Sequence, residues 1–329
     1  SNSIMYSDII DVDVDVSNLS VTYSLVYDVS GTGNFYNDPL FCNVDSSDFT
    51  LHDNSPCVGT GQDGANIGAL GVGCGTFSDG TGGDITVGES PYYISPTGSE
   101  FASGTESDPF SSFYVAFSHT ESGDTIYVFP GTYSGDYNQE IIANNHDLAI
   151  IGTGSADETV FELTNKFMGF SGAGVDGNIR NITFTGTLQN NNVLSAYGHQ
   201  NNYGTLTLDS CKFVNLSQSS AVRFSSYVTG NISNCVFSGN VGRPVDPYII
   251  KAGNYGTLNL SGCLFYNNQT IDTYGTNRGV IYGSTRYTLN IDRCTFNDNG
   301  GEGSIAIYDE SSALDDHITI TNSIFYSDI

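Results

Sequence analysis

A short pattern of apolar and polar positions returns along the second half of the chain. It begins with an aliphatic residue, passes through two small or polar residues to a buried position, and ends in x-Phe before an Asn- or Gly-rich turn. Four copies carry cysteine at the buried position, with spacings of 24, 28 and 31 residues. Self-similarity at such a period indicates a repeat architecture. The copies begin at Ile179, Leu208, Ile232, Leu260, Ile291 and Ile320.

The alternation within each copy indicates strands rather than helices. Short alternating stretches are joined by polar turns, and no 3.6-residue periodicity is present. One coil per copy would stack parallel strands about 4.8 Å apart, with Ile, Leu, Phe and Cys in inward columns and Asp, Asn, Ser and Thr outside. The varying spacing requires turns of different length. We therefore predict an all-β fold, a right-handed parallel β-helix.

Residues 92–133 predict the start of this solenoid. Asp108 followed by proline is typical of a helix N-cap with proline at the first helical position. Phe110, Phe113 and Phe117 would then lie on one face of a short helix. We expect this N-terminal capping helix to cover the open edge of the first coil, where unpaired strands invite aggregation.

The beginning of the chain differs in kind from the coils. Residues 1–75 predict a terminal coil followed by a closing cap, residues 76–91 form a Gly/Ser/Asp-rich linker, and residues 92–329 carry the β-helix. The first nine residues, SNSIMYSDI, match the last nine, TNSIFYSDI, at seven positions. A cap that precedes its own coils must dock on a preceding copy or on the last coil of its own chain.

The excess of acidic over basic residues disfavours two classes of binding partner. The 329 residues include 36 acidic residues against 9 Lys plus Arg, a formal net charge of −27. Nucleic acid is disfavoured because its phosphates would be repelled, and anionic membrane surfaces are disfavoured for the same reason. No apolar run of about 18 residues is present, so membrane insertion is not expected.

Several segments resemble a known family. The stretch YYISPTGS, the later GDTIYVFPGTY, and the segments NDPLF, SPCVGTG and NIGALG are similar to the opening and ending of pectate-lyase-like right-handed β-helix domains in bacterial surface proteins. The resemblance covers most of the chain and implies the fold. It leaves function open, because this class mixes polysaccharide-active enzymes with adhesins and other secreted repeat proteins.

The resemblance also suggests where an enzyme site would lie. Polysaccharide lyases of this family use outward carboxylates, often with calcium, and a Lys or Arg as base. Arg223 and Lys251 fall at matching points of successive coils, and Asp246 lies in an adjoining turn. The leading expectation is no catalytic residue, and these three residues are the candidate catalytic set of the alternative, enzymatic interpretation. Surface charges that offset neighbouring acids are the competing interpretation.

The seven cysteines form two groups. Cys57 and Cys74 bracket a Gly-rich loop in the cap, and we predict a disulfide between them, with Cys42 as an alternative partner. Such a bond fits an extracellular compartment. The other four are expected to be buried thiols of one inward column that pack as small apolar side chains. They are Cys211, Cys235, Cys263 and Cys294.

Three alternating carboxylates are the candidate metal ligands. Asp11, Asp13 and Asp15 would share one face of a strand, about 6.6 Å apart. Calcium takes several such oxygen ligands. A solvated outer face is the alternative, so the cofactor expectation is none, or calcium.

The repeated ends favour a structural role. We expect a non-enzymatic, extracellular or cell-surface protein, one unit of a filament, sheath or adhesin, whose copies join head to tail by strand addition. The alternative is a secreted protein that binds or cleaves acidic glycans with the Arg223 and Lys251 flank. Partners would be copies of the chain itself and surface glycans. The expected junction residues are Ser3, Ile4, Met5 and Tyr6 against Ser323, Ile324, Phe325 and Tyr326.

Overall fold

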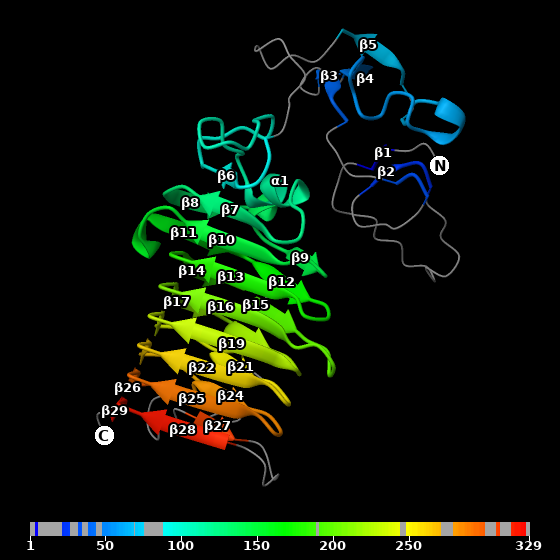
Figure 1. Cartoon of the computed structure of the whole chain (residues 1–329). Coiled ribbons are helices and arrows are strands. Elements are labelled where there is room, and N and C mark those ends of the chain that lie inside the picture. The colour runs from blue at the N-terminus through cyan, green and yellow to red at the C-terminus, as the bar shows by residue number, and fades with distance from the viewer. Residues whose placement is uncertain are drawn as a thin grey trace. The chain divides into compact units, whose positions relative to one another are not determined.

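The computed structural model contains two compact units, Ser1–Asp84 and Ile85–Ile329, which divide inside the predicted linker (Figure 1). We refer to them as the first and the second unit. The residues that the structure describes are 4–5, 22–26, 32–34, 39–43, 48–68, 70–75, 88–188, 191–243, 248–270, 279–299, 307–309 and 317–326.

Three parallel sheets make up the second unit, and the chain visits each of them once per coil (Figure 1). The nine-stranded sheet holds β6 (Tyr92–Ile94), β7 (Asp124–Val128), β10 (Leu148–Gly152), β13 (Asp176–Arg180), β16 (Gly204–Asp209), β19 (Val228–Ser233), β22 (Thr257–Ser261), β25 (Thr288–Asp292) and β28 (His317–Thr321). The eight-stranded sheet holds β8 (Gly131–Ser134), β11 (Thr159–Leu163), β14 (Thr183–Thr187), β17 (Lys212–Ser217), β20 (Val236–Ser238), β23 (Leu264–Tyr266), β26 (Thr295–Asn297) and β29 (Ile324–Tyr326). The seven-stranded sheet holds β9 (Ile141–Asn144), β12 (Met168–Ser171), β15 (Asn192–Tyr197), β18 (Ser220–Phe224), β21 (Ile250–Ala252), β24 (Ile281–Gly283) and β27 (Ile307–Asp309).

The repeated sequence pattern is the corner between the nine-stranded and the eight-stranded sheet. Its third residue has a left-handed backbone, with φ between 51° and 63° from one coil to the next. Small polar residues and glycine tolerate this conformation best, which explains why Asn, Ser and Gly occupy most copies. The corner residues are Asn181, Ser210, Asn234, Gly262, Arg293 and Asn322.

A ladder of phenylalanines follows three residues after each corner. Successive ring centroids lie 4.6 to 5.2 Å apart, and the rings are stacked nearly parallel in the later coils. Each ring is therefore covered by the coils on both sides, except at the last rung, where Phe325 is 45% exposed. The ladder contains Phe184, Phe213, Phe237, Phe265, Phe296 and Phe325.

A second ladder satisfies polar groups inside the coils. The Nδ2 of Asn268 donates to the Phe237 carbonyl and to Oδ1 of Asn299, and the Nδ2 of Asn240 donates in the same way to Phe213 and Asn268. All three asparagines are buried. Buried amides that are bonded in this way hold adjacent coils in register at little desolvation cost.

The helix near the start of the coils is shorter and begins later than the sequence indicates. It is α1 (Phe113–Ser118), and the Ser112 hydroxyl accepts from the Val115 N–H at 3.4 Å as the N-cap. The expectation of an N-cap at Asp108 is wrong, because Phe110 donates its N–H to the Tyr93 carbonyl in a strand-like pairing. Helical structure is otherwise confined, in the described residues, to the short η3 (Gln62–Gly64), η4 (Asp136–Asn138) and η5 (Ala156–Glu158).

The side chains of α1 join the core at its start. Phe113 and Ala116 are buried, and the Phe113 ring lies 5.1 Å from that of Phe167. That the helix closes the first coil stays a prediction. None of the helices among the described residues is long and apolar enough to cross a membrane.

The first unit is much smaller. Strands β1 (Ile4–Met5) and β2 (Leu25–Val26) pair in parallel. In a separate sheet, β3 (Phe41–Asn43) pairs antiparallel with β4 (Asp48–His52), and β4 pairs in parallel with β5 (Val72–Cys74). Its buried apolar cluster consists of Leu51, Cys57 and Ile67.

Candidate functional site

One outward column crosses the seven-stranded sheet and gathers positive charge. The strand register places Gly169, Ser195, Arg223, Lys251 and Tyr282 opposite one another in β12, β15, β18, β21 and β24. We call this set the basic column. The sequence prediction that Arg223 and Lys251 occupy matching points of successive coils is confirmed by the register.

The alternation of β18 explains why Arg223 faces outward. Val222 and Phe224 on either side of it are buried in the core. Because side chains alternate between the two faces of a strand, the Arg223 side chain lies on the opposite face. The same alternation in β21 buries Ile250 and Ala252 and directs Lys251 outward.

Arg223 has no acidic partner among the residues that the structure describes. Arg223 as a whole is half-buried, and its Nε atom is buried without a hydrogen-bond partner. In the described ranges, ion pairs join Lys212 to Asp157 and Arg293 to Asp292, and neither includes Arg223. The Nε–H is therefore an unused donor, and a guanidinium group suits a planar anion such as a carboxylate.

Aromatic rings surround the neighbouring cation. The Lys251 Nζ lies 5.0 Å from the centroid of the Tyr282 ring and 5.8 Å from that of Tyr248. The two rings are themselves 5.6 Å apart, and both tyrosines are buried. Cation–π attraction therefore holds the ammonium in place next to Arg223.

The other end of the column adds an unpartnered hydroxyl and a further cation. Ser195 is only 1% exposed, and its Oγ has no hydrogen-bond partner. A methyl group built on Gly169 would lie 3.2 Å from the Ser195 Oγ and 3.7 Å from the Lys166 Nζ. Lys166 therefore approaches the column beside Ser195. Sequence reasoning missed this residue because it lies in a turn outside the periodic strands.

Polar space is also present on a different sheet. A hollow of about 400 Å³ lies over the eight-stranded sheet, and Lys212, Tyr266 and Asn267 help to line it. Its cation is engaged, since the Lys212 Nζ lies 2.6 Å from an Asp157 oxygen. The basic column does not contribute to this hollow.

A comparison with protein families identifies the architecture. A family model described as a right-handed β-helix region matches residues 168–328. The fold is a right-handed parallel β-helix. The fold that the sequence predicted is therefore confirmed, including its handedness. No curated protein matches the chain.

Solved structures that match the chain include two lyases and a methylesterase. A rhamnogalacturonan lyase is 14% identical, with a TM-score of 0.36, over 72% of this chain and 62% of that chain. A pectin methylesterase from Aspergillus niger is 12% identical, with a TM-score of 0.36, over 73% and 88%. A pectate lyase is 17% identical, with a TM-score of 0.32, over 73% and 79%. The chain thus spans under two thirds of the rhamnogalacturonan lyase.

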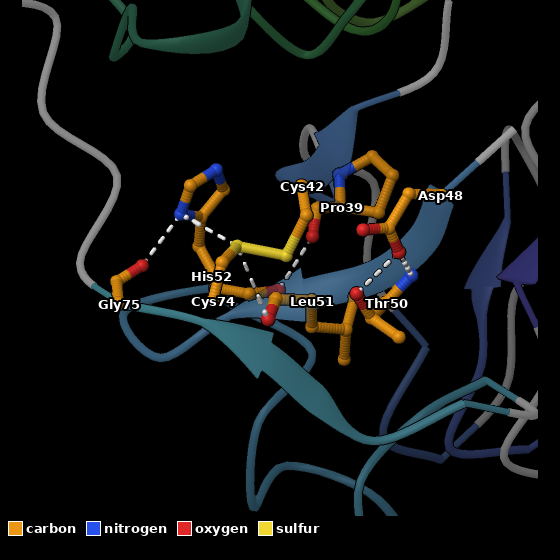
Figure 2. Close-up of a disulfide and its surroundings, with 9 residues drawn as sticks. Pro39, Cys42, Asp48, Thr50, Leu51, His52, Cys74 and Gly75 are labelled. Carbon is orange, nitrogen blue, oxygen red and sulfur yellow. Dashed lines mark hydrogen bonds between the residues drawn. A yellow bond between two sulfur atoms is a disulfide. The ribbon is translucent and has the colours of Figure 1, made fainter. Parts of the chain in front are cut away.

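The disulfide joins a different pair of cysteines from the one predicted. Cys42 in β3 and Cys74 in β5 are bonded, with Cα atoms 6.0 Å apart, as Figure 2 shows. The prediction of a Cys57–Cys74 bond is wrong because Cys57 is fully buried with Leu51 and Ile67 and remains a free thiol. The antiparallel pairing of β3, which brings Cys42 close, was not evident from the sequence.

A histidine lies against this disulfide. The His52 Nδ1 is 2.5 Å from the Gly75 carbonyl oxygen and 3.1 Å from the Cys74 Sγ (Figure 2). One donor atom from each of Cys42, His52 and Cys74 lies within 4.8 Å of the others, a grouping that suits a metal ion. The chemistry of these atoms does not suit a metal ion, because both sulfurs are used in the S–S bond and the Gly75 carbonyl requires the proton on Nδ1.

The four repeated cysteines are buried free thiols of one β-helix column, each at most 2% exposed. Burial raises the pKa of the Cys235 thiol well above its ordinary value. A buried thiol of raised pKa is a poor nucleophile, which suits a packing role for Cys235, and the burial of all four residues suits the same role. They are Cys211, Cys235, Cys263 and Cys294.

Several predicted site residues lie outside the described part of the chain. Asp246 of the candidate catalytic set is among them, and so are the junction residues Ser3 and Tyr6. The carboxylates of the calcium expectation, Asp11, Asp13 and Asp15, also lie outside it. Their roles therefore stay predictions.

Proposed function

We propose that this β-helix binds an acidic polysaccharide along the basic column. The observation that carries the proposal is the register of Arg223 with Lys251 on one outward face. The sequence led us to expect either a structural filament role or a glycan-binding role, and this proposal adopts the glycan-binding role. The resemblance to pectate-lyase-like domains favours the same class of ligand.

The electrostatics of the column support an anionic ligand. Like charges directly opposite each other in adjacent strands repel, so a sequence that keeps them there carries a cost. The cost is offset when a carboxylate lies between them. A polymer with regularly spaced carboxylates can contact Lys166, Arg223 and Lys251 together, which gives avidity along the column.

The overall charge makes such binding selective. With a net charge of −27, the chain repels polyanions over most of its surface. Three of its nine basic residues lie on or beside the basic column. A uronate polymer would therefore be held at this face, and binding should weaken as salt screens it.

The experiment compares two double variants of equal charge. Arg223→Gln with Lys251→Gln removes the column cations, while Arg180→Gln with Arg293→Gln removes two exposed cations that lie outside the seven-stranded sheet. Binding to polygalacturonate, measured by calorimetry, should fall at least tenfold in the first variant and less than twofold in the second. Equal losses would refute the assignment of the site.

Catalysis and calcium are tested in the same assay. Lyases create an unsaturated product that absorbs in the ultraviolet. A rise in absorbance on incubation would extend the proposal to cleavage, with Arg223 or Lys251 as base. Repeating the assay with calcium and with a chelator tests a role for that ion.

Head-to-tail association of copies is a second proposal, supported by the last strands. Apolar side chains of β28 and β29 are 42% to 60% exposed, which is unusual for a sheet edge. The motif of β29 is repeated at Ile4–Met5, where β1 pairs in parallel with a further strand. The exposed side chains are Ile318, Ile320, Ile324, Phe325 and Tyr326.

Sedimentation of the chain tests this association. The single variants Ile324→Asp and Phe325→Asp should abolish concentration-dependent assembly, and deletion of residues 1–75 should do the same. Assembly that survives all three changes would contradict the proposal. An extracellular or cell-surface location belongs to both proposals, and the Cys42–Cys74 disulfide supports it because such bonds persist in oxidising compartments.

A further inference from the structure

The disulfide of the first unit differs in accessibility from every other cysteine. Cys42 and Cys74 are half-buried, whereas Cys57 and the four column cysteines are at most 2% exposed. Both residues of this bond therefore keep part of their surface exposed in the folded unit. Accessibility is the first requirement for thiol–disulfide exchange.

The position of the His52 ring proton distinguishes the two sulfurs of the disulfide. A carbonyl oxygen only accepts hydrogen bonds, so the contact of 2.5 Å with Gly75 requires the proton on Nδ1 of His52. The same Nδ1 atom lies 3.1 Å from the Cys74 Sγ (Figure 2). The Gly75 carbonyl thus fixes the tautomer and accepts the Nδ1 proton, and it holds that N–H beside the Cys74 sulfur, which is a second acceptor within reach.

The two sulfurs are unequal as a result. Cys74 has a hydrogen-bond donor beside it, while no donor contacts the Cys42 Sγ among the described residues. A thiolate that accepts a hydrogen bond is stabilised, and the better-stabilised thiol is the better leaving group. Attack at Cys42 with departure of Cys74 is therefore the favoured route.

We propose that Cys42–Cys74 is an exchange-active disulfide that captures an external thiol at Cys42, with His52 as the positioning residue for the leaving sulfur. The incoming thiolate forms a new S–S bond to the Cys42 Sγ as the Cys42–Cys74 bond breaks. The electron pair of that bond goes to Cys74, which departs as a thiolate held by the His52 N–H. The incoming thiol gives its proton to solvent, and no other oxidant or reductant is consumed.

The experiment uses the oxidised full chain and glutathione as the probe. After brief reaction, a maleimide traps released thiolates, and peptide mapping by mass spectrometry locates both adducts. We expect glutathione on Cys42 and maleimide on Cys74, in a ratio of at least ten to one over the reverse. Equal labelling, reversed labelling or absence of reaction would overturn the proposal, and this result needs no variant.

A pair of histidine variants tests the positioning role. His52→Asn should slow the exchange about tenfold and remove the preference for Cys42, because a hydrogen bond to a charged group is lost. His199→Asn, the same change in the second unit, should alter neither. Unchanged regiochemistry in His52→Asn would refute the role of His52.

Cys57 reports whether the first unit stays folded in these variants. Its thiol is buried in the small cluster with Leu51 and Ile67, so maleimide should label it only on unfolding. Protection of Cys57 in His52→Asn makes a loss of regiochemistry attributable to the imidazole. A Cys57→Ser chain should give the same glutathione adduct as the parent.

Discussion

Different interactions stabilise the fold of each of the two units. The second unit repeats the same contacts from coil to coil, with a phenylalanine ladder and an asparagine ladder inside it. The first unit has a buried apolar cluster of three residues and a disulfide across its three-stranded sheet. In the second unit, identical side chains stack from coil to coil, and the apolar area that they bury is enough to stabilise the fold. Among its described residues, the first unit has no such stack, and a covalent bond stabilises it instead.

The largest effect on stability is expected from a substitution in the middle of the phenylalanine ladder. Phe265 lies 4.7 Å from the Phe237 ring and 4.6 Å from the Phe296 ring. Phe265→Ala should lower the free energy of unfolding of the second unit by about 3–5 kcal/mol, because a cavity opens between two coils. Chemical denaturation followed by circular dichroism measures it.

Phe325→Ala is the matched control for this variant. Its ring is the last rung and is 45% exposed, so the expected loss is less than half as large. A loss at Phe325 equal to that at Phe265 would mean that burial between coils is not what stabilises the ladder.

The second prediction removes the covalent bond from the first unit. The disulfide closes a loop with a sequence separation of 32 residues. Cys42→Ser with Cys74→Ser should cost this unit about 3–4 kcal/mol through the greater entropy of its unfolded chain. Hydrogen exchange in β4 should rise accordingly, while the denaturation midpoint of the second unit stays unchanged. A shift of that midpoint would contradict the expectation that this disulfide stabilises the first unit alone.

The smallest prediction concerns a carboxylate at a coil corner. The Ser233 hydroxyl, with further help from the Asn234 amide, lowers the pKa of Asp209 below its ordinary value. A lowered pKa means that the stabilisation is present above the unfolded pKa of about 3.9 and is lost as the pH falls through the folded pKa.

Asp209→Asn should therefore flatten the loss of stability of the second unit between about pH 5 and pH 3. Solvent screening keeps the effect at neutral pH well under about 1 kcal/mol. Denaturation curves across this pH range check the sign. A variant that loses stability on acidification as steeply as the parent would contradict it.

The periodic part of the molecule could be predicted because each coil repeats the same constraint. The motif with Cys or Ser three residues after the aliphatic position fixes a left-handed corner and a buried Phe, so strand register followed from alignment of the copies. The partnership of Arg223 with Lys251 was predictable for the same reason.

The non-periodic features could not be predicted in this way. The pairing of Cys42 with Cys74 depends on an antiparallel strand, which no repeat specifies. The start of α1 depends on Phe110, whose backbone is engaged by Tyr93 rather than by a helix. The approach of Lys166 to Gly169 depends on the path of a single turn.

The fixed corner has a consequence for engineering by module exchange. From the left-handed residue to the ladder phenylalanine, every copy has the same length, as Asn234 to Phe237 and Gly262 to Phe265 illustrate. Differences in length between copies must therefore fall in the other turns of each coil. A whole coil excised from one corner to the next can be transplanted or duplicated without altering the corner geometry, and foreign peptides are best grafted into the turns of variable length.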